Sequence, residues 1–309
     1  MKIVFKYLTS ILFLLFSFNI LAQDFELLKI RSAYYPKQSI EESSVDGEIG
    51  FFEWGGQLAI PQTFKKNKKT ILIHKVLYAN LRADIEGNPA NGLVVSNKYY
   101  HTISYNLGLV QTLSPKWRLI LNLNPTLASD FEESLSEDDL LYQANAMIIN
   151  TKNTKFQYGF GLAYTTRFGR QIVIPMGMLN YRTAKMNLNI VLPNKLSVLF
   201  KKADSKFLYG LEAGLNGGLF NNTNDVQTIN TLIDETGYSR FTFGPALSLN
   251  LKNGVKIQFN GGVAVGRKLE FIDANEEVFD RTPEVGPFFS MGISFSPKKK
   301  NGGEGQSKN

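Results

Sequence analysis

The alternation that decides the fold is clearest in the stretch Phe156-Gln157-Tyr158-Gly159-Phe160-Gly161-Leu162-Ala163-Tyr164-Thr165. Its even-numbered side chains are large and apolar or aromatic, whereas its odd-numbered side chains are small or polar. Because successive side chains of a β-strand point to opposite faces, this period of two predicts a strand with one apolar face. The same alternation recurs in residues 103–109, 117–124, 207–216, 240–251, 255–265 and 284–295. We therefore predict an all-β protein.

The two faces of these strands differ in a way that separates a membrane barrel from a soluble sandwich. One face is uniformly apolar, and the other carries Gly, Asn and scattered charges. A soluble sandwich turns its apolar faces inward and presents Lys, Glu and Thr outside. Segments of about 10 residues that alternate apolar-out and polar-in, separated by turns, are typical of transmembrane β-barrels. We therefore expect an apolar outer wall around a packed, polar interior.

The connections between the strands alternate between two lengths. Short, mostly lysine-rich turns are expected at residues 65–69, 114–116, 152–154, 183–185 and 252–254. Long loops are expected at about residues 37–47, 85–98, 129–139, 221–237 and 272–283. Bacterial outer-membrane barrels have short periplasmic turns and longer extracellular loops, so this alternation favours the same fold.

The strand number depends on one ambiguous segment. Counting apolar runs gives about 13 strands, whereas bacterial single-chain barrels have an even number. A tight turn at Pro193-Asn194-Lys195 would split the segment into Met186–Leu192 and Leu196–Lys201 and bring the total to 14. Pro193 cannot donate to a strand ladder, which supports a turn there. We predict a transmembrane antiparallel up-and-down β-barrel of 12–14 strands and favour 14; with 12, one short run lies outside the barrel.

The two ends of the chain differ from the body. Residues 1–22 have a positive start, with Lys2 and Lys6, an apolar stretch over 7–21 and the small residue Ala22. This order is typical of a secretory signal peptide, and a spanning anchor would need about 20 apolar residues. We assign residues 23–295 to the barrel. Residues 296–309 form a basic, glycine-containing tail that is expected to be flexible.

Composition excludes several kinds of chemistry. The 309 residues include no Cys and two His, so disulfide frameworks, thiol catalysis and Cys-ligated metals are excluded. We expect no cofactor and no metal. Of the net charge of +7, two positive charges lie in the leader and a net three in the tail, which leaves +2 on the body. The basic balance therefore does not predict nucleic acid as a partner.

A family resemblance supports the barrel prediction. It rests on Phe168-Gly169-Arg170, Ile172-Val173-Ile174-Pro175, Tyr181-Arg182, Leu188-Asn189, Leu192-Pro193 and Leu196. These residues, the leader and the strand pattern resemble a domain-of-unknown-function family of bacterial outer-membrane β-barrel proteins. The resemblance implies location in the bacterial outer membrane, contact with its lipid and lipopolysaccharide, and insertion by the barrel assembly machinery. It carries over no catalytic residue. Phe295 resembles the aromatic end that this machinery reads, although the tail follows it.

The candidate site residues are charges on the predicted inward face: Glu53, Arg118, Glu212, Arg240, Lys256 and Glu284. An Arg or Lys that faces lipid at mid-depth costs about 2–4 kcal/mol, so inward placement is expected. These charges could line a selective pore. They could instead form a salt-bridge network that fills a closed barrel, and their balanced signs favour this second interpretation.

The predicted function is therefore a non-enzymatic outer-membrane barrel with a structural role, or a narrow channel for small polar solutes. One alternative is an outer-membrane enzyme that modifies lipid. Such enzymes pair a His with a Ser two residues later, and neither His74 nor His101 has this spacing. The other alternative is a soluble periplasmic all-β binding protein.

Overall fold

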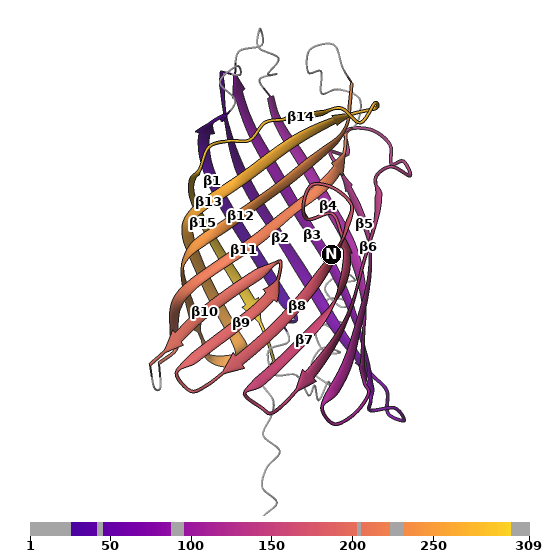
Figure 1. The fold of residues 1–309 in the computed structure, drawn as a ribbon, viewed down its shortest axis with the longest axis vertical. Helices are drawn as coiled ribbons and strands as arrows, with labels where there is room; N and C mark the ends of the chain where they lie inside the picture. The colour runs from indigo at the N-terminus through magenta and orange to yellow at the C-terminus, as the bar shows by residue number, and fades with distance from the viewer. Residues whose placement is uncertain (1–25, 42–45, 88–95, 203–204, 223–231, 298–309) are drawn as a thin grey trace, which may run out of the picture.

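The computed structural model describes residues 26–41, 46–87, 96–202, 205–222 and 232–297. The predicted signal peptide and nearly all of the predicted tail lie outside these residues. Within them, long tilted strands wrap around one central space (Figure 1). No helix of the described residues is long and apolar enough to cross a membrane.

The barrel has 14 strands, each paired antiparallel with the next around the wall. The first strand pairs with the last, which closes the ring. The barrel strands are β1 (Leu28–Ser39), β2 (Gly47–Thr63), β3 (Thr70–Gly87), β4 (Ser96–Thr112), β5 (Trp117–Ser129), β6 (Leu140–Thr151), β7 (Phe156–Thr165), β8 (Ile172–Arg182), β9 (Met186–Leu192), β10 (Lys195–Lys201), β11 (Phe207–Asn221), β12 (Ile233–Asn250), β13 (Val255–Asp273) and β15 (Gly286–Phe295). A short strand, β14 (Val278–Asp280), pairs only with β13, and a short 3-10 helix, η2 (Lys252–Gly254), joins β12 to β13.

The ambiguous segment is two strands, as predicted. β9 and β10 pair antiparallel, with Lys195 opposite Val191, and only Pro193 and Asn194 lie between them. The hairpin is the shortest of the wall, with seven residues in each strand. The total of 14 is thereby confirmed.

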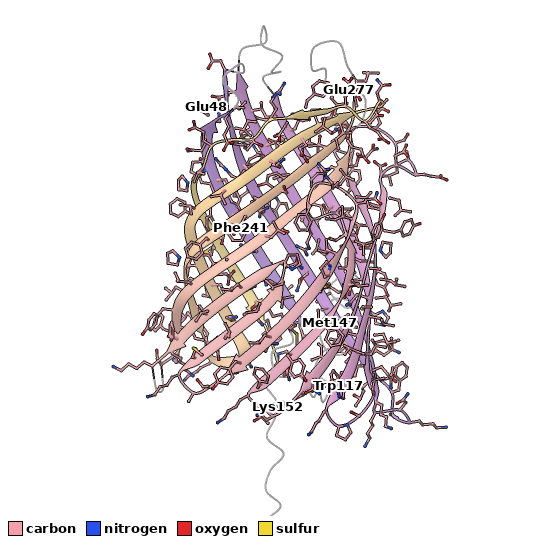
Figure 2. The ribbon with its side chains drawn as sticks, in the orientation of Figure 1. Glu48, Trp117, Met147, Lys152, Phe241 and Glu277 are labelled. Atoms are coloured by element: carbon pink, nitrogen blue, oxygen red, sulfur yellow. The ribbon has the colours of Figure 1, made fainter. Side chains whose placement is uncertain are left out.

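The outer face of the wall is apolar, as the alternation predicts. On β5, Leu121 and Leu123 are exposed on the outside, whereas the Asn122 amide donates to Asn145 Oδ1 at 2.8 Å on the inside. Phe241 lies on the outer face of β12 in the middle of the wall (Figure 2). Such residues occur on strands around the wall, including Ile30, Trp54, Val76, Tyr105, Phe160, Val173, Phe200, Tyr209, Phe243, Phe259, Phe289 and Ile293.

The connections follow the expected alternation, but the strands reach further than predicted at one end. Loops were expected from 85 to 98 and from 221 to 237. Instead, β2 and β3 stay paired as far as Gly47 opposite Gly87, and β11 and β12 as far as Asn221 opposite Glu235. Backbone ladders do not require apolar side chains, so polar residues near the loops remain in the strands. A further connection, at 166–171 between β7 and β8, was not predicted as a loop. Residues 88–95 and 223–231 lie outside the described part of the chain.

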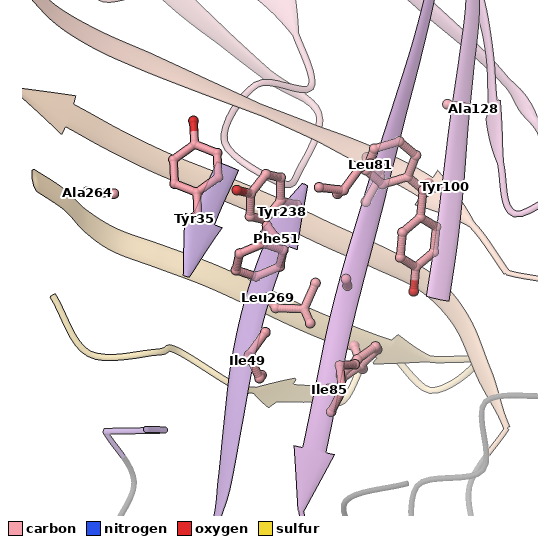
Figure 3. Close-up of a cluster of buried hydrophobic side chains, with 14 of the residues drawn as sticks. Tyr35, Ile49, Phe51, Leu81, Ile85, Tyr100, Ala128, Tyr238, Ala264 and Leu269 are labelled. Atoms are coloured by element: carbon pink, nitrogen blue, oxygen red, sulfur yellow. The ribbon is translucent and has the colours of Figure 1, made fainter. Parts of the chain in front are cut away.

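The prediction of a polar interior is wrong for the end with the long loops. A cluster of buried apolar side chains lies there inside the barrel (Figure 3). On β2, Ile49 and Phe51 face inward beside Glu53, and on β3, Leu81 and Ile85 do so. The outward neighbours of these residues include Phe52 and Trp54, so both faces are apolar there and alternation alone does not reveal the facing.

Candidate functional site in the barrel lumen

The end of the lumen near the long loops is filled by side chains. We call this group the luminal apolar cluster; its buried members are Ala33, Tyr35, Ile40, Ile49, Phe51, Leu81, Ala83, Ile85, Tyr100, Ala128, Leu141, Leu219, Phe220, Ile233, Tyr238, Ala264, Leu269, Phe271 and Phe288. Aromatic rings join strands that are not neighbours in the wall. The centroids of Phe51 and Tyr238 are 4.7 Å apart, and those of Tyr100 and Phe220 are 4.9 Å apart. The cluster therefore connects β2 with β12 and β4 with β11 across the lumen (Figure 3).

Polar contacts cross the lumen at the same level. The hydroxyls of Tyr100 on β4 and Thr236 on β12 are 3.0 Å apart. The backbone N–H of Asp130, just after β5, donates to the carbonyl of Asn221 on β11 at 3.3 Å. The Asn221 amide donates to Asp139 Oδ1 at 2.9 Å. Because β4 and β5 stand opposite β11 and β12, these bonds brace two facing walls.

A charged network lies directly beneath the cluster. The Arg240 guanidinium on β12 donates to the Tyr35 hydroxyl on β1 and to the Glu53 carboxylate on β2. It also lies 4.8 Å from the Tyr35 ring centroid and 5.3 Å from that of Tyr238. Only 3% of the Arg240 side chain is exposed. A charge removed from water in this way is tolerated because its partner carries the opposite charge.

The other four predicted charges lie apart from this pair. The Glu212 carboxylate forms an ion pair with Lys195 Nζ at 2.7 Å and accepts a hydrogen bond from the Asn260 amide at 3.2 Å. Arg118 is exposed near a short turn and donates to the Thr151 hydroxyl at 3.3 Å.

Lys256 and Glu284 lie at opposite ends of the barrel. Lys256 stands opposite Ser294 near the short turns. Glu284 is exposed in the connection before β15, outside the strands, so the alternation rule does not apply to it. Of the six charges, Glu53 and Arg240 form an ion pair with each other.

A cavity of about 360 Å³ lies between the apolar cluster and the short turns. Its charged lining consists of Lys29, Arg31, Glu53, Arg167 and Arg240. Lys29 and Arg31 were not among the predicted site residues. Their neighbours Leu28 and Ile30 are apolar and exposed on the outer face, so the alternation of β1 would have placed both basic residues inside. Arg167 could not be found in this way, because it belongs to a loop.

That loop, residues 166–171, packs against β11 and β12, where Gly169 contacts Gly237 and the carbonyl of Arg167 lies close to Gly217. Arg167 Nη1 donates to Asn216 Oδ1 at 2.8 Å. Gly237 on β12 allows the close approach, because a Cβ there would lie 2.6 Å from the carbonyl oxygen of Gly169. Gly169 itself has a φ of 75°, a conformation that favours glycine. The loop thereby places a guanidinium inside the lumen.

The two histidines lie outside this cavity. His74 Nδ1 is 2.6 Å from the Tyr105 hydroxyl, and its Nε2 is 3.0 Å from Gln62 Oε1. His101 Nδ1 is 2.8 Å from the Tyr78 hydroxyl, and the ring stacks on Phe131. Both rings lie on the outer face of the wall, since they share it with Tyr105 and Tyr78. Over the described ranges there is no group of three or more His, Cys, Asp or Glu that could hold a metal.

A closed antiparallel barrel of 14 strands with an apolar outer face is an outer-membrane β-barrel fold. Residues 29–296 match the model of the family described as Domain of unknown function (DUF6268). The chain belongs to this family.

Solved barrels are similar to this chain at low sequence identity. The NanC porin is 9% identical with a TM-score of 0.36, over 87% of this chain and 99% of the porin. LpxR from Salmonella typhimurium is 9% identical with a TM-score of 0.35, over 87% of this chain and 99% of LpxR. The translocator domain of autotransporter NalP from Neisseria meningitidis is 12% identical with a TM-score of 0.30, over 96% of this chain and 97% of that domain. No curated protein matches the chain. The fold assignment rests on the strand pairing of this chain.

Proposed function

We propose that this protein spans the bacterial outer membrane, with its short turns in the periplasm and its long loops outside. Support comes from the apolar side chains that surround the wall and from the unequal length of the connections at the two ends. Figure 2 shows Lys152 and Trp117 near one end and Glu48 and Glu277 near the other. Lipid and lipopolysaccharide would then be its surroundings, and the barrel assembly machinery would insert it.

We infer that the barrel acts as a narrow channel for small polar solutes, here in a closed state, and not as a general porin. The observation that carries this proposal is the luminal apolar cluster, which crosses the lumen on the extracellular side of the polar cavity. Water and ions avoid a dry apolar constriction, and channels use such constrictions as gates. A solute from the periplasmic side could enter the cavity but would be stopped at the cluster.

A purely structural role is the second candidate, and the same cluster favours it. Its buried aromatic rings and the cross-lumen hydrogen bonds would stiffen the wall whether or not the lumen ever opens. For either role we propose that the protein is not an enzyme. In support, both histidines are bonded to phenol hydroxyl groups and His101 also stacks on Phe131, contacts that suit a structural role.

Liposome swelling with the purified protein tests the channel. The wild type should admit small sugars slowly. Phe51→Ala combined with Tyr238→Ala removes two rings in contact across the lumen and should accelerate swelling at least tenfold. The matched control is Phe241→Ala, which removes a ring of the same strand on the outer face and should leave the rate unchanged.

Three outcomes would contradict these proposals. Fast swelling of the wild type, at the rate of a general porin, would exclude the closed state. Slow swelling of the folded double variant would favour the purely structural role. Recovery of the protein as a soluble periplasmic species, rather than in the detergent-extracted envelope fraction, would exclude the proposed location.

A further inference from the structure

The charges that line the luminal cavity are strongly unbalanced. Four of the lining residues are basic and one is acidic. Glu53 is paired with Arg240, and Lys29 Nζ is 3.1 Å from a Glu26 carboxylate oxygen. In the part of the chain that the structure describes, neither Arg31 nor Arg167 forms an ion pair. Within the described residues, these two guanidinium groups that line one cavity therefore lack a negative partner.

The contacts of these two arginines leave donors free for a ligand. Arg31 Nη2 donates to the Ser290 hydroxyl at 3.4 Å, and Arg167 Nη1 donates to Asn216 Oδ1 at 2.8 Å. Each guanidinium carries five N–H donors, and its planar fork matches a carboxylate or a phosphate. Lys75 lies near enough to Lys29 and Arg167 to add to the positive potential. An anion placed between these basic groups and shielded in part from bulk water would be attracted more strongly than one in open solvent.

The rest of the lining indicates the kind of anion. Amide and hydroxyl groups of Gln57, Thr102, Ser104, Asn124 and Gln143 surround the basic residues. Such groups both donate and accept hydrogen bonds, as a ligand rich in hydroxyls requires. A volume of about 360 Å³ lies at the small end of the range for small-molecule sites. The cavity therefore suits a compact polar molecule.

We propose that the luminal cavity binds a small hydroxylated organic anion through its carboxylate or phosphate, held by Arg31 and Arg167. The proposal deepens the proposed function, since it names the chemical class of the solute. The anion would supply the negative charge that the two arginines lack, while the amide and hydroxyl groups would bind its body. The apolar cluster would form the wall of the site on the extracellular side.

Isothermal titration calorimetry on the full-length mature protein in detergent micelles tests this proposal. The probes are glucuronate, which carries a carboxylate, glucose 6-phosphate, which carries a phosphate, and neutral glucose. We expect saturable binding of at least one anion, with glucose at least tenfold weaker. The anion that binds identifies the oxyanion that the site prefers.

Two variants and one matched control locate the binding. Arg31→Gln and Arg167→Gln should each weaken binding of that anion at least tenfold. Arg170→Gln is the control, since Arg170 belongs to the same loop but is 62% exposed and does not line the cavity. It should bind as the wild type does. Heat-modifiable migration on gels verifies that each variant is a folded barrel.

The inference is overturned if neither anion binds, if glucose binds equally well, or if the two lumen variants bind as tightly as the control. These outcomes are independent of the swelling assay. A wild type that conducts freely yet binds an anion at Arg167 would contradict the closed channel and leave this site standing. A wild type that stays closed but binds neither anion would support the closed channel and contradict the anion site.

Discussion

Arg240 is the residue on which the lumen depends most heavily. Its guanidinium is almost entirely removed from water, and it contacts Tyr35, Glu53 and Tyr238 on three separate strands. A pair of buried charges contributes little net stability compared with apolar residues of the same size. Loss of one partner is costly, because the remaining charge stays buried without compensation.

We therefore expect Arg240→Ala to lower the free energy of unfolding by about 3–5 kcal/mol. Urea titration of the protein refolded into lipid bilayers measures this change. Arg118→Ala serves as the control, since Arg118 is exposed at the barrel mouth and its loss should cost less than about 1 kcal/mol. Equal losses for the two variants would show that the Glu53–Arg240 pair does not stabilise the barrel.

For single residues, the sequence predicted which side chains face the lumen but not which of them contact each other. The alternation placed Glu53 and Arg240 on the inner face, yet 187 residues separate them. Their pairing depends on strand order and on the width of the barrel, which no local pattern contains. Arg167 escaped prediction altogether, because the side chains of a loop follow no period that would show where they point.

The strands themselves follow simple rules of facing, and β5 shows them most clearly. Leu121 is 36% exposed on the outer face, and Asn122 bonds to Asn145 on the inner face. A charge on the lipid face costs about 2–4 kcal/mol near the midplane, whereas one in the lumen can reach water or polar groups. We expect Leu121→Arg to lower the free energy of unfolding from bilayers by about that amount.

The neighbouring substitution, Asn122→Arg, is the matched comparison. It should cost less in the same refolding titration, although the larger side chain must fit beside Gly108 and Asn145. A larger loss for Asn122→Arg than for Leu121→Arg would reverse the facing that we assign to β5.

The loop between β5 and β6 depends on the ionised form of one carboxylate. Asp139 Oδ2 accepts the Ser136 N–H at 2.8 Å, and Oδ1 accepts the Asn221 amide at 2.9 Å. Burial alone would raise the pKa of Asp139, but hydrogen bonds from Ser136, Asn221 and Ser129 outweigh it and lower the pKa from its ordinary 3.8. A lowered pKa stabilises the folded loop above the ordinary value, and this stability is lost as pH falls through the lowered one.

Hydrogen exchange of the Ser136 amide should therefore be slow at neutral pH and accelerate below about pH 4, relative to the intrinsic rate. Asp139→Asn should exchange faster already at neutral pH. Asp138→Asn, which changes the exposed neighbour, should behave as the wild type. Protection of Ser136 that persists in Asp139→Asn would show that the carboxylate does not hold the loop.

The strands were easier to predict from the sequence than the residues at which they end. The hairpin of β9 and β10 was predictable because Pro193 forbids a continuous ladder. The far ends of β3, β4, β11 and β12 were not, because polar residues near the loops pair through their backbones without any alternation. The sequence therefore shows where a strand lies more clearly than where it ends.

For the whole molecule, the barrel was predictable and the balanced inward charges favoured a filled lumen, but the apolar side chains that fill it were not predicted. The apolar outer face requires alternation, and alternation over long segments indicates a barrel. The luminal apolar cluster arises where both faces are apolar, as around Phe51 and Leu81. The sequence contains no mark there of which face is inside, so it predicted a polar interior throughout. Only the assembled ring shows that the rings of Phe51 and Tyr238 meet.

Single-channel recording of the purified wild type in planar lipid bilayers shows whether the lumen is closed. Because apolar side chains and cross-lumen hydrogen bonds fill one end of the barrel, we expect conductance far below that of general porins, with no long-lived openings. Large, stable conductance that rises in proportion to salt concentration would show an open lumen, since it requires a continuous aqueous path where the structure places Tyr35, Phe51, Tyr100 and Tyr238.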